Sequence, residues 1–266
     1  MAKLWLVDLN AAAPALAAVE RETPRLSRED RERAMALHNA RERQHRLAAY
    51  TALRVALESM AGVRTRQRAF RRSAAGRPYL TGIAAPFSLS HTDGLALIGV
   101  APLRRIGVDI EKARSACTSQ ARRQQIMAAG AGLAGLTLRS SRGDRRNHGF
   151  LQAWTRLEAY AKAQGQAILR VLHDLGVRNP AHGVPLDAIR EAAQRAAAAR
   201  RLRVLDLALP RGLLGAVAID VGCPPPRLRR FPCDVAGIRR LTSQPAKRDA
   251  PPPEPLKRRT LTGPPS

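Results

Sequence analysis

Two carboxylates stand two residues apart in the run Arg105-Ile106-Gly107-Val108-Asp109-Ile110-Glu111. Apolar residues alternate with Asp109 and Glu111, which predicts a strand with both acids on the same side. Hard oxygen ligands at this spacing suit Mg²⁺, which binds a few carboxylates and keeps positions open for water and phosphate oxygens. An edge strand with a solvated acidic face gives the same pattern, so the run alone leaves both interpretations open.

A second pair of charged residues lies in a helical pattern that runs from Trp154 to Gly165. Glycine commonly follows the last residue of a helix, so Gly165 is expected to close this one. Glu158 and Lys162 are four residues apart and therefore share a helix face. They could form an ordinary surface ion pair, or they could join the acidic strand around a metal ion and a phosphate group.

Two further runs lie upstream, Gly76-Arg77-Pro78-Tyr79-Leu80 and Phe87-Ser88-Leu89-Ser90-His91-Thr92-Asp93-Gly94. With Gly107-Val108-Asp109-Ile110-Glu111 and Trp154-x-x-x-Glu158-Ala159-x-x-Lys162-Ala163-x-Gly165 they make an ordered set of four. This set resembles the motifs of the 4′-phosphopantetheinyl transferase superfamily, and the chain length is similar to its longer, two-halved type, which activates surfactin synthetase.

The resemblance implies transfer of 4′-phosphopantetheine from coenzyme A to a serine of an apo carrier protein, with release of 3′,5′-ADP. It implies Mg²⁺ as the metal, held by Asp109, Glu111 and Glu158. Glu158, or a water molecule that it orients, would be the general base, and Lys162 and His91 would act with it on the phosphates. The expected partner is an acidic acyl or peptidyl carrier protein, and the expected oligomeric state is a monomer.

The residues that the resemblance assigns to coenzyme A are mostly cationic: Arg33, Arg46, Arg77, Ser90, His91 and Lys162. Arg33 and Arg46 would grip the 3′-phosphate, although arginines on a helix equally describe a solvated face. A second basic position of the family falls near Asp30, which is acidic here. A lone histidine such as His91 is more often structural, and only the motif around it favours a ligand-binding role.

Three further features depart from the family pattern. Arg77 stands where lysine is usual, and Leu157 replaces the lysine that usually precedes Glu158. Loss of that lysine is expected to weaken a substrate contact while leaving the metal carboxylate in place. The stretch Lys112–Arg146 lacks the usual Phe-x-x-x-Glu element, which puts carrier recognition in doubt more than chemistry.

The remaining patterns predict an α+β fold with two similar halves, residues 1–104 and 105–222, related by a pseudo-two-fold axis. Strands are expected at residues 3–9 and in hairpins at 87–100 and 201–221, and helices follow Ser27, Arg41 and Pro185. Residues 11–23 are predicted as a loop or weak helix because Pro14 interrupts them. Residues 223–266 hold eleven prolines and ten Lys or Arg, so a disordered basic tail is expected.

The composition narrows the class of protein. A net charge of +25 attracts polyanions: nucleic acid, an anionic membrane or an acidic protein. No helix-turn-helix, zinc or RNA-recognition signature accompanies the charge, so nucleic acid is the less favoured partner. No apolar run is long enough to cross a membrane, and the three cysteines show no paired spacing, so a cytoplasmic protein is expected. A family member that has lost activity and acts as a binding module stays an alternative.

Overall fold

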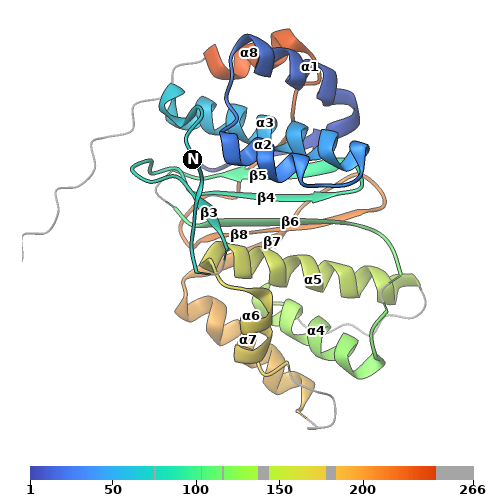
Figure 1. Ribbon diagram of the computed structural model, residues 1–266. Helices are drawn as coiled ribbons and strands as arrows, with labels where there is room; N and C mark the ends of the chain where they lie inside the picture. The colour runs from blue at the N-terminus through green and yellow to red at the C-terminus, as the bar shows by residue number, and fades with distance from the viewer. Residues whose placement is uncertain (75, 103, 116, 137–143, 178–183, 244–266) are drawn as a thin grey trace, which may run out of the picture.

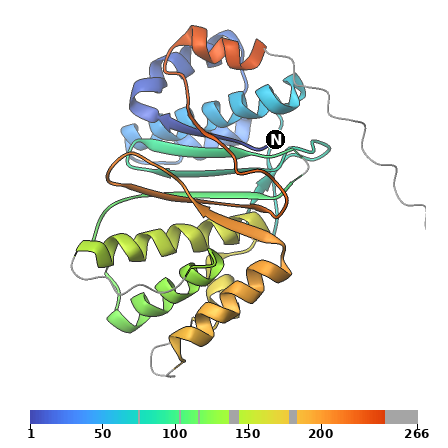
Figure 2. The ribbon, with the colours of Figure 1, turned by 180° about the vertical axis from the view of Figure 1, so that it is seen from behind.

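The protein, described here by a computed structural model, is a mixed α+β structure in which two packed sheets lie between two sets of helices (Figure 1). The structure describes residues 1–243 except 75, 103, 116, 137–143 and 178–183. Seen from behind, the same helix–sheet–sheet–helix order is visible (Figure 2). No helix within these residues is both long and apolar enough to cross a membrane.

The first sheet has the strand order β4-β5-β1-β9. Its strands are β1 (Lys3–Asp8), β4 (Phe87–Thr92), β5 (Leu95–Val100) and β9 (Leu228–Arg230). Strand β5 pairs antiparallel with both β4 and β1, and β9 pairs parallel with β1. Its outer face is covered by α1 (Leu9–Glu22), α3 (Ala40–Ala61) and α8 (Val235–Ser243), with α2 (Arg28–Met35) packed on α3.

The second sheet has the order β6-β8-β7 and is antiparallel throughout. Its strands are β6 (Ile106–Lys112), β7 (Leu202–Asp206) and β8 (Leu213–Asp220). The helices on its outer side are α4 (Gln120–Leu133), α5 (Asp144–Gln164), α6 (Ile168–Asp174) and α7 (Leu186–Ala199). A short hairpin of β2 (Arg71–Arg72) and β3 (Pro78–Tyr79) stands apart from both sheets. A 3₁₀ turn, η1 (Val63–Thr65), follows α3.

Three apolar clusters account for the layers, because alternate residues of a strand face opposite sides. In β1, Trp5 and Val7 face the upper helices, whereas Leu4 faces the second sheet. In β6, Ile106, Val108 and Ile110 face the first sheet and are at most 1% exposed. The other face of β6, which carries Asp109 and Glu111, therefore points toward α5.

The two sheets share one connectivity. In the first sheet, β1 is followed by helices and then by the hairpin β4–β5, and β5 pairs with β1. In the second sheet, β6 is followed by helices and then by the hairpin β7–β8, and β8 pairs with β6. This shared connectivity supports the proposal that the chain has two related halves, residues 1–104 and 105–222, with a pseudo-two-fold relation between them.

The hairpins at 87–100 and 201–221, the first strand and the helix after Ser27 are confirmed. Ser27 caps α2 in a capping box with Asp30, and Gly62 ends α3. The prediction for residues 11–23 understated their structure, because α1 is a complete helix with Pro14 inside it. Burial of its apolar face, including Leu16 and Val19, offsets the one backbone hydrogen bond that proline removes.

The prediction of a disordered tail from residue 223 is wrong for residues 228–243. Strand β9 extends the first sheet, and α8 packs on α1 and α3 with Ile238 1% exposed. Phe231, only 3% exposed, and Ile238 supply the apolar anchors that the proline count obscured. Residues 244–266 of the predicted tail lie outside the described residues.

Candidate active site

Strand β6 and helix α5 pack closely against each other at Gly107, which has no side chain. A Cβ atom on Gly107 would lie 2.0 Å from the carbonyl oxygen of Ala159 and 2.4 Å from the amide nitrogen of Ala163. Only glycine allows α5 to approach β6 this closely. The approach brings Glu158 and Lys162 on the helix to the side of the strand that carries the two carboxylates.

Asp109 is the centre of the polar contacts at this junction. The Lys162 Nζ donates to Asp109 Oδ1 at 2.6 Å, and the Ser90 hydroxyl donates to the same oxygen at 2.7 Å. Lys162 also donates to the Ser90 Oγ at 3.3 Å. Asp109 is 4% exposed, and its second oxygen, Oδ2, is buried without a hydrogen-bond partner. The structure therefore brings together one residue from each of three predicted motifs.

The two other predicted metal ligands lie nearby but are differently engaged. Glu158 is half-buried, and burial raises the pKa of its carboxyl group. Lys162 opposes this shift, whereas the charges of Asp109 and Glu111 add to it. Glu111 accepts a hydrogen bond from Arg114 at 3.2 Å. A carboxyl group whose pKa is raised in this way suits proton exchange near neutral pH.

The three predicted metal carboxylates offer oxygen donors but no preformed metal cage. Within the described part of the chain, no three His, Cys, Asp or Glu side chains converge as a ready metal site. Lys162 supplies the positive charge on Asp109 instead. The orphaned Asp109 Oδ2 and the hard oxygen donors beside it suit Mg²⁺ in kind, since Mg²⁺ prefers one or two carboxylates together with phosphate oxygens.

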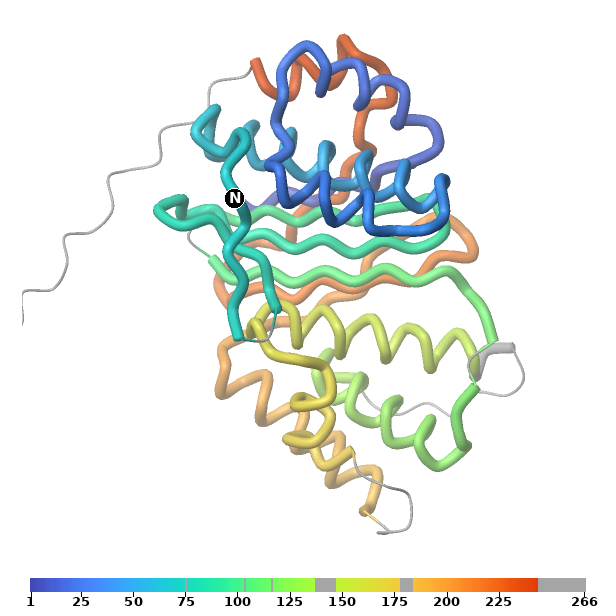
Figure 3. The backbone as a smooth tube through the Cα atoms, viewed as in Figure 1, coloured from blue at the N-terminus to red at the C-terminus, as the bar shows by residue number. Residues whose placement is uncertain are grey.

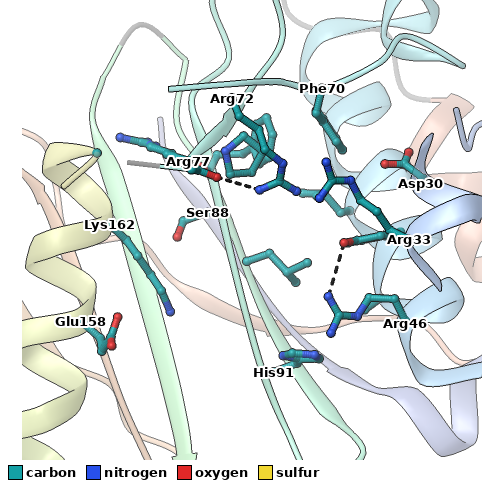
Figure 4. Close-up of a pocket in the computed structure, with 18 of the residues that line it drawn as sticks. Asp30, Arg33, Arg46, Phe70, Arg72, Arg77, Ser88, His91, Glu158 and Lys162 are labelled. Atoms are coloured by element: carbon teal, nitrogen blue, oxygen red, sulfur yellow. Dashed lines mark hydrogen bonds between the residues drawn. The ribbon is translucent and has the colours of Figure 1, made fainter. Parts of the chain in front are cut away.

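A cavity of about 500 Å³ opens beside this junction. Its polar lining includes Glu158 and Lys162 from α5 and a group of cations from other elements, which Figure 4 shows around one space. These cations are Arg33, Arg46, Arg72 and Arg77, and the imidazole of His91 also lines the cavity. Phe70, Phe87 and Leu53 supply apolar wall. The cavity thus combines an anion-binding surface with an apolar one.

Arg33 and Arg46, which the resemblance assigns to the 3′-phosphate, both line this cavity. Arg33 is exposed, and Arg46 donates to the Tyr50 hydroxyl at 3.4 Å while its Nε is buried without a partner. Among the described residues, no carboxylate forms an ion pair with Arg33, Arg46 or Arg72. Glu29 and Asp30 line the same cavity, but these three arginines are left without an ion-pair partner in the described part of the chain, which indicates a place for an anionic ligand.

His91 lines the cavity at the end of β4. Its side chain keeps an exposed face, but protein packed around the ring lowers its pKa, and Arg46 and Lys162 lower it further. The neutral imidazole is therefore favoured near pH 7. Ser90 does not reach the cavity lining, because its hydroxyl is turned to Asp109.

Arg77 lines the cavity, but its guanidinium is bonded to backbone. It donates to the carbonyl oxygens of Ala163 and Ile106 at 3.0 Å each, and to that of Phe87 at 3.4 Å. Burial lowers the pKa of this guanidinium. Arg77 thus lines the cavity with three of its five N–H donors already bonded to backbone.

Leu157 departs from the role that the family pattern gives its position. Its side chain is fully buried in the cluster between the second sheet and its helices. A lysine here would face core and not the cavity, so the expected loss of a substrate contact is not supported for this chain.

Asp30 is likewise explained by a partner. It accepts two hydrogen bonds from the buried guanidinium of Arg54, at 2.9 and 2.6 Å, while capping α2. Arg54 also stacks on the Phe70 ring that lines the cavity, with its Cζ 3.8 Å from the ring centroid. Asp30 itself lines the cavity, and Arg54 supports this wall from behind.

Sequence reasoning missed Arg72 and Tyr50, which line the same cavity. Arg72 is exposed, donates to the carbonyl oxygen of Gly76 at 2.7 Å and points toward Arg33 in Figure 4. It lay in a connector rich in arginine, where no local spacing distinguishes one guanidinium from the next.

Comparison with known proteins covers the second half of this site. Residues 105–208 match the model of the 4′-phosphopantetheinyl transferase superfamily, so the chain contains a domain of that superfamily. The match spans Asp109, Glu111, Glu158 and Lys162, and it excludes Arg33, Arg46 and His91. No curated protein matches the chain.

Proposed function

We propose that the protein transfers 4′-phosphopantetheine from coenzyme A to a serine of an apo acyl or peptidyl carrier protein. The observation that carries this proposal is the cavity in which Arg33, Arg46, Lys162 and Glu158 meet beside the buried Asp109. The superfamily match over residues 105–208 supports the same reaction class.

Coenzyme A would lie along the cavity from its cationic end to α5. Arg33 and Arg46 would hold the 3′-phosphate, since neither has a carboxylate partner among the described residues. Lys162 and His91 would face the pyrophosphate, His91 as a neutral donor. Ser90 would contribute through Lys162 and Asp109, which its hydroxyl contacts.

The chemical step would be attack of the serine oxygen on the β-phosphorus of coenzyme A. The bond between that phosphorus and the bridging oxygen breaks, and 3′,5′-ADP departs with the electron pair. The serine proton passes to Glu158, directly or through a water molecule, and the raised pKa of this carboxyl group suits such a base. Lys162 would stabilise charge that develops on the phosphate oxygens.

Asp109, Glu111 and Glu158 would hold Mg²⁺. When bound, Mg²⁺ would neutralise charge on the pyrophosphate and orient it. Lys162 forms an ion pair with Asp109 in the ligand-free protein. With Mg²⁺ bound at Asp109, the ammonium group of Lys162 would be available to the phosphates.

The charge of the chain supports an acidic carrier protein as the partner. A chain of net charge +25 attracts acidic domains and accelerates their encounter at low salt. We assign the protein to the longer, two-halved type acting as a monomer, because one chain supplies both Arg33 and Lys162 to one cavity.

Intact-mass spectrometry of several apo carrier proteins, incubated with this protein, coenzyme A and Mg²⁺, tests the proposal. The expected result is that at least one carrier gains the mass of one phosphopantetheine. No gain is expected when EDTA is present during the incubation. A folded protein that modifies none of them but binds coenzyme A would be a binding module instead. Salt-sensitive DNA binding without any effect of coenzyme A would point to nucleic acid.

A further inference from the structure

We propose that Arg77 is a positioning residue whose guanidinium fastens α5 to strands β4 and β6. We call its three bonds, to the carbonyl groups of Ala163, Ile106 and Phe87, the clasp. The clasp would hold Glu158 and Lys162 opposite Asp109, and Arg77 would not bind a phosphate itself. The catalytic consequence rests on the proposed function, whereas the clasp is a property of the protein without ligand.

The contacts of Arg77 join three elements that are distant in sequence. Its Nη1 donates to Ala163 in α5, and its Nη2 donates to Ile106 in β6 and to Phe87 in β4. The β2–β3 hairpin brings Arg77 there, and Figure 3 shows this hairpin descending past the sheets to the end of α5. Strands β4 and β6 belong to different sheets, so Arg77 also spans the junction between the sheets.

The end of α5 explains why a donor is needed at this point. Gly165 has a φ of +69°, and a Schellman motif closes the helix with bonds from Gly165 to Lys162 and from Gln166 to Ala161. This motif leaves the carbonyl of Ala163 without a helical partner. Arg77 supplies the missing donor, and a cation at a helix C-terminus also opposes the negative end of the helix dipole.

The guanidinium of Arg77 is bonded to three backbone carbonyl groups, which leaves fewer of its donors for a phosphate. No carboxylate within the described residues compensates its charge, and burial lowers its pKa. A buried charge of this kind is costly unless hydrogen bonds compensate it, and the three carbonyl oxygens provide those bonds. In Figure 4, Arg77 extends away from Arg33 and Arg72, toward the helix that carries Lys162.

The substitution Arg77→Lys separates the two roles. Lysine keeps the charge, which is what a phosphate contact requires, but it lacks the planar fork that reaches several carbonyls at once. Arg77→Met removes both charge and donors, and Arg71→Lys is the matched control. Arg71 is exposed on the same hairpin, has its own backbone pairing with Tyr79 and does not line the cavity.

The first measurement is thermal unfolding of the ligand-free variants, with hydrogen exchange of the amides of Gly165 and Gln166. The clasp predicts that Arg77→Lys lowers Tm by about 5 °C or more and speeds exchange at both amides, since hydrogen bonds from a charged donor are lost. Arg71→Lys should change neither. An unchanged or raised Tm in Arg77→Lys, with unchanged exchange, would overturn the clasp.

The second measurement is titration with coenzyme A and the rate of carrier modification. A positioning role predicts that Arg77→Lys and Arg77→Met lose rate by similar factors, at least tenfold, with affinity for coenzyme A altered alike. A phosphate contact predicts a different order, in which lysine retains the affinity and methionine loses it. If the unmodified protein transfers nothing, the proposed function fails, and the stability and exchange results still decide the clasp.

Discussion

The ammonium of Lys162 lies 2.6 Å from Asp109 Oδ1, across the contact between helix α5 and strand β6. The pair joins the two motifs that carry the three predicted metal carboxylates, and Gly107 makes their approach possible. Without ligand, the lysine neutralises one oxygen of a buried carboxylate, while the other oxygen has no partner. The geometry therefore couples the residue proposed to hold Mg²⁺ to the residue proposed to meet phosphate.

Asp109→Ala is expected to abolish carrier modification, by at least about a hundredfold, while the protein stays folded. The substitution removes the buried oxygens proposed for Mg²⁺ and frees Lys162, which is partly exposed and can be solvated. Intact-mass assays measure the transfer, and circular dichroism reports the fold. Asp174→Ala is the control, because Asp174 pairs with Arg170 at the surface. Full activity in Asp109→Ala would overturn the metal assignment.

Arg33→Met is expected to weaken binding of coenzyme A by about tenfold, the value of one charge-assisted contact. Binding of dephospho-coenzyme A, which lacks the 3′-phosphate, should be the same for this variant and the unmodified protein. Isothermal titration with both ligands measures the difference. Arg31→Met on the same helix is the control, since Arg31 pairs with Glu20 and does not line the cavity. An equal loss for both ligands would place Arg33 away from the 3′-phosphate.

The parts of the site that sequence predicted depend on local periodicity. Alternation in β6 predicts that Asp109 and Glu111 face one side, and the four-residue spacing predicts that Glu158 and Lys162 share a face. The contacts that sequence could not predict are long-range. Nothing local to Arg72 indicates that it faces Arg33.

Residues 228–243 show that composition, like local spacing, does not reveal long-range contacts. Composition averages over residues 223–266, and prolines with arginines dominate that average. Two apolar side chains, Phe231 and Ile238, nevertheless find the upper core because strand β1 offers a free edge to β9. Pairing with a distant edge leaves no trace in local composition.

His91 should make stability depend on pH. Its folded-state pKa is lowered, first by burial and then by Arg46 and Lys162, so below the ordinary value the unfolded chain binds a proton more readily. The free energy of unfolding should therefore fall as pH falls below about 6.5. His91→Gln should lose less stability between pH 7.5 and 5.5 in urea unfolding. His173→Gln, at an exposed site, is the control. Parallel pH curves for His91→Gln and the unmodified protein would contradict the assigned shift.

Leu157→Lys should destabilise the protein by more than about 3 kcal/mol, because it buries a charge without a partner in the lower core. It should not raise activity, although it restores the residue usual in the family. Leu157→Met should cost less than about 1.5 kcal/mol, since it nearly conserves volume. Leu169→Lys, at a side chain that is 74% exposed, controls for the added charge. A stable and more active Leu157→Lys variant would show that this position reaches substrate.

Gly107→Ala should destabilise the protein by about 3 kcal/mol or more, because the new methyl group meets backbone atoms of α5 that cannot move without shifting the helix. The same shift should separate Lys162 from Asp109 and reduce carrier modification. Gly149→Ala, within the same helix, is the matched control. A Cβ there would meet only the flexible end of Met127, at 3.2 Å, so alanine should be neutral or stabilise by up to about 1 kcal/mol. Urea unfolding of both variants measures the contrast, and equal stability of the two would mean that α5 does not rest on β6 at Gly107.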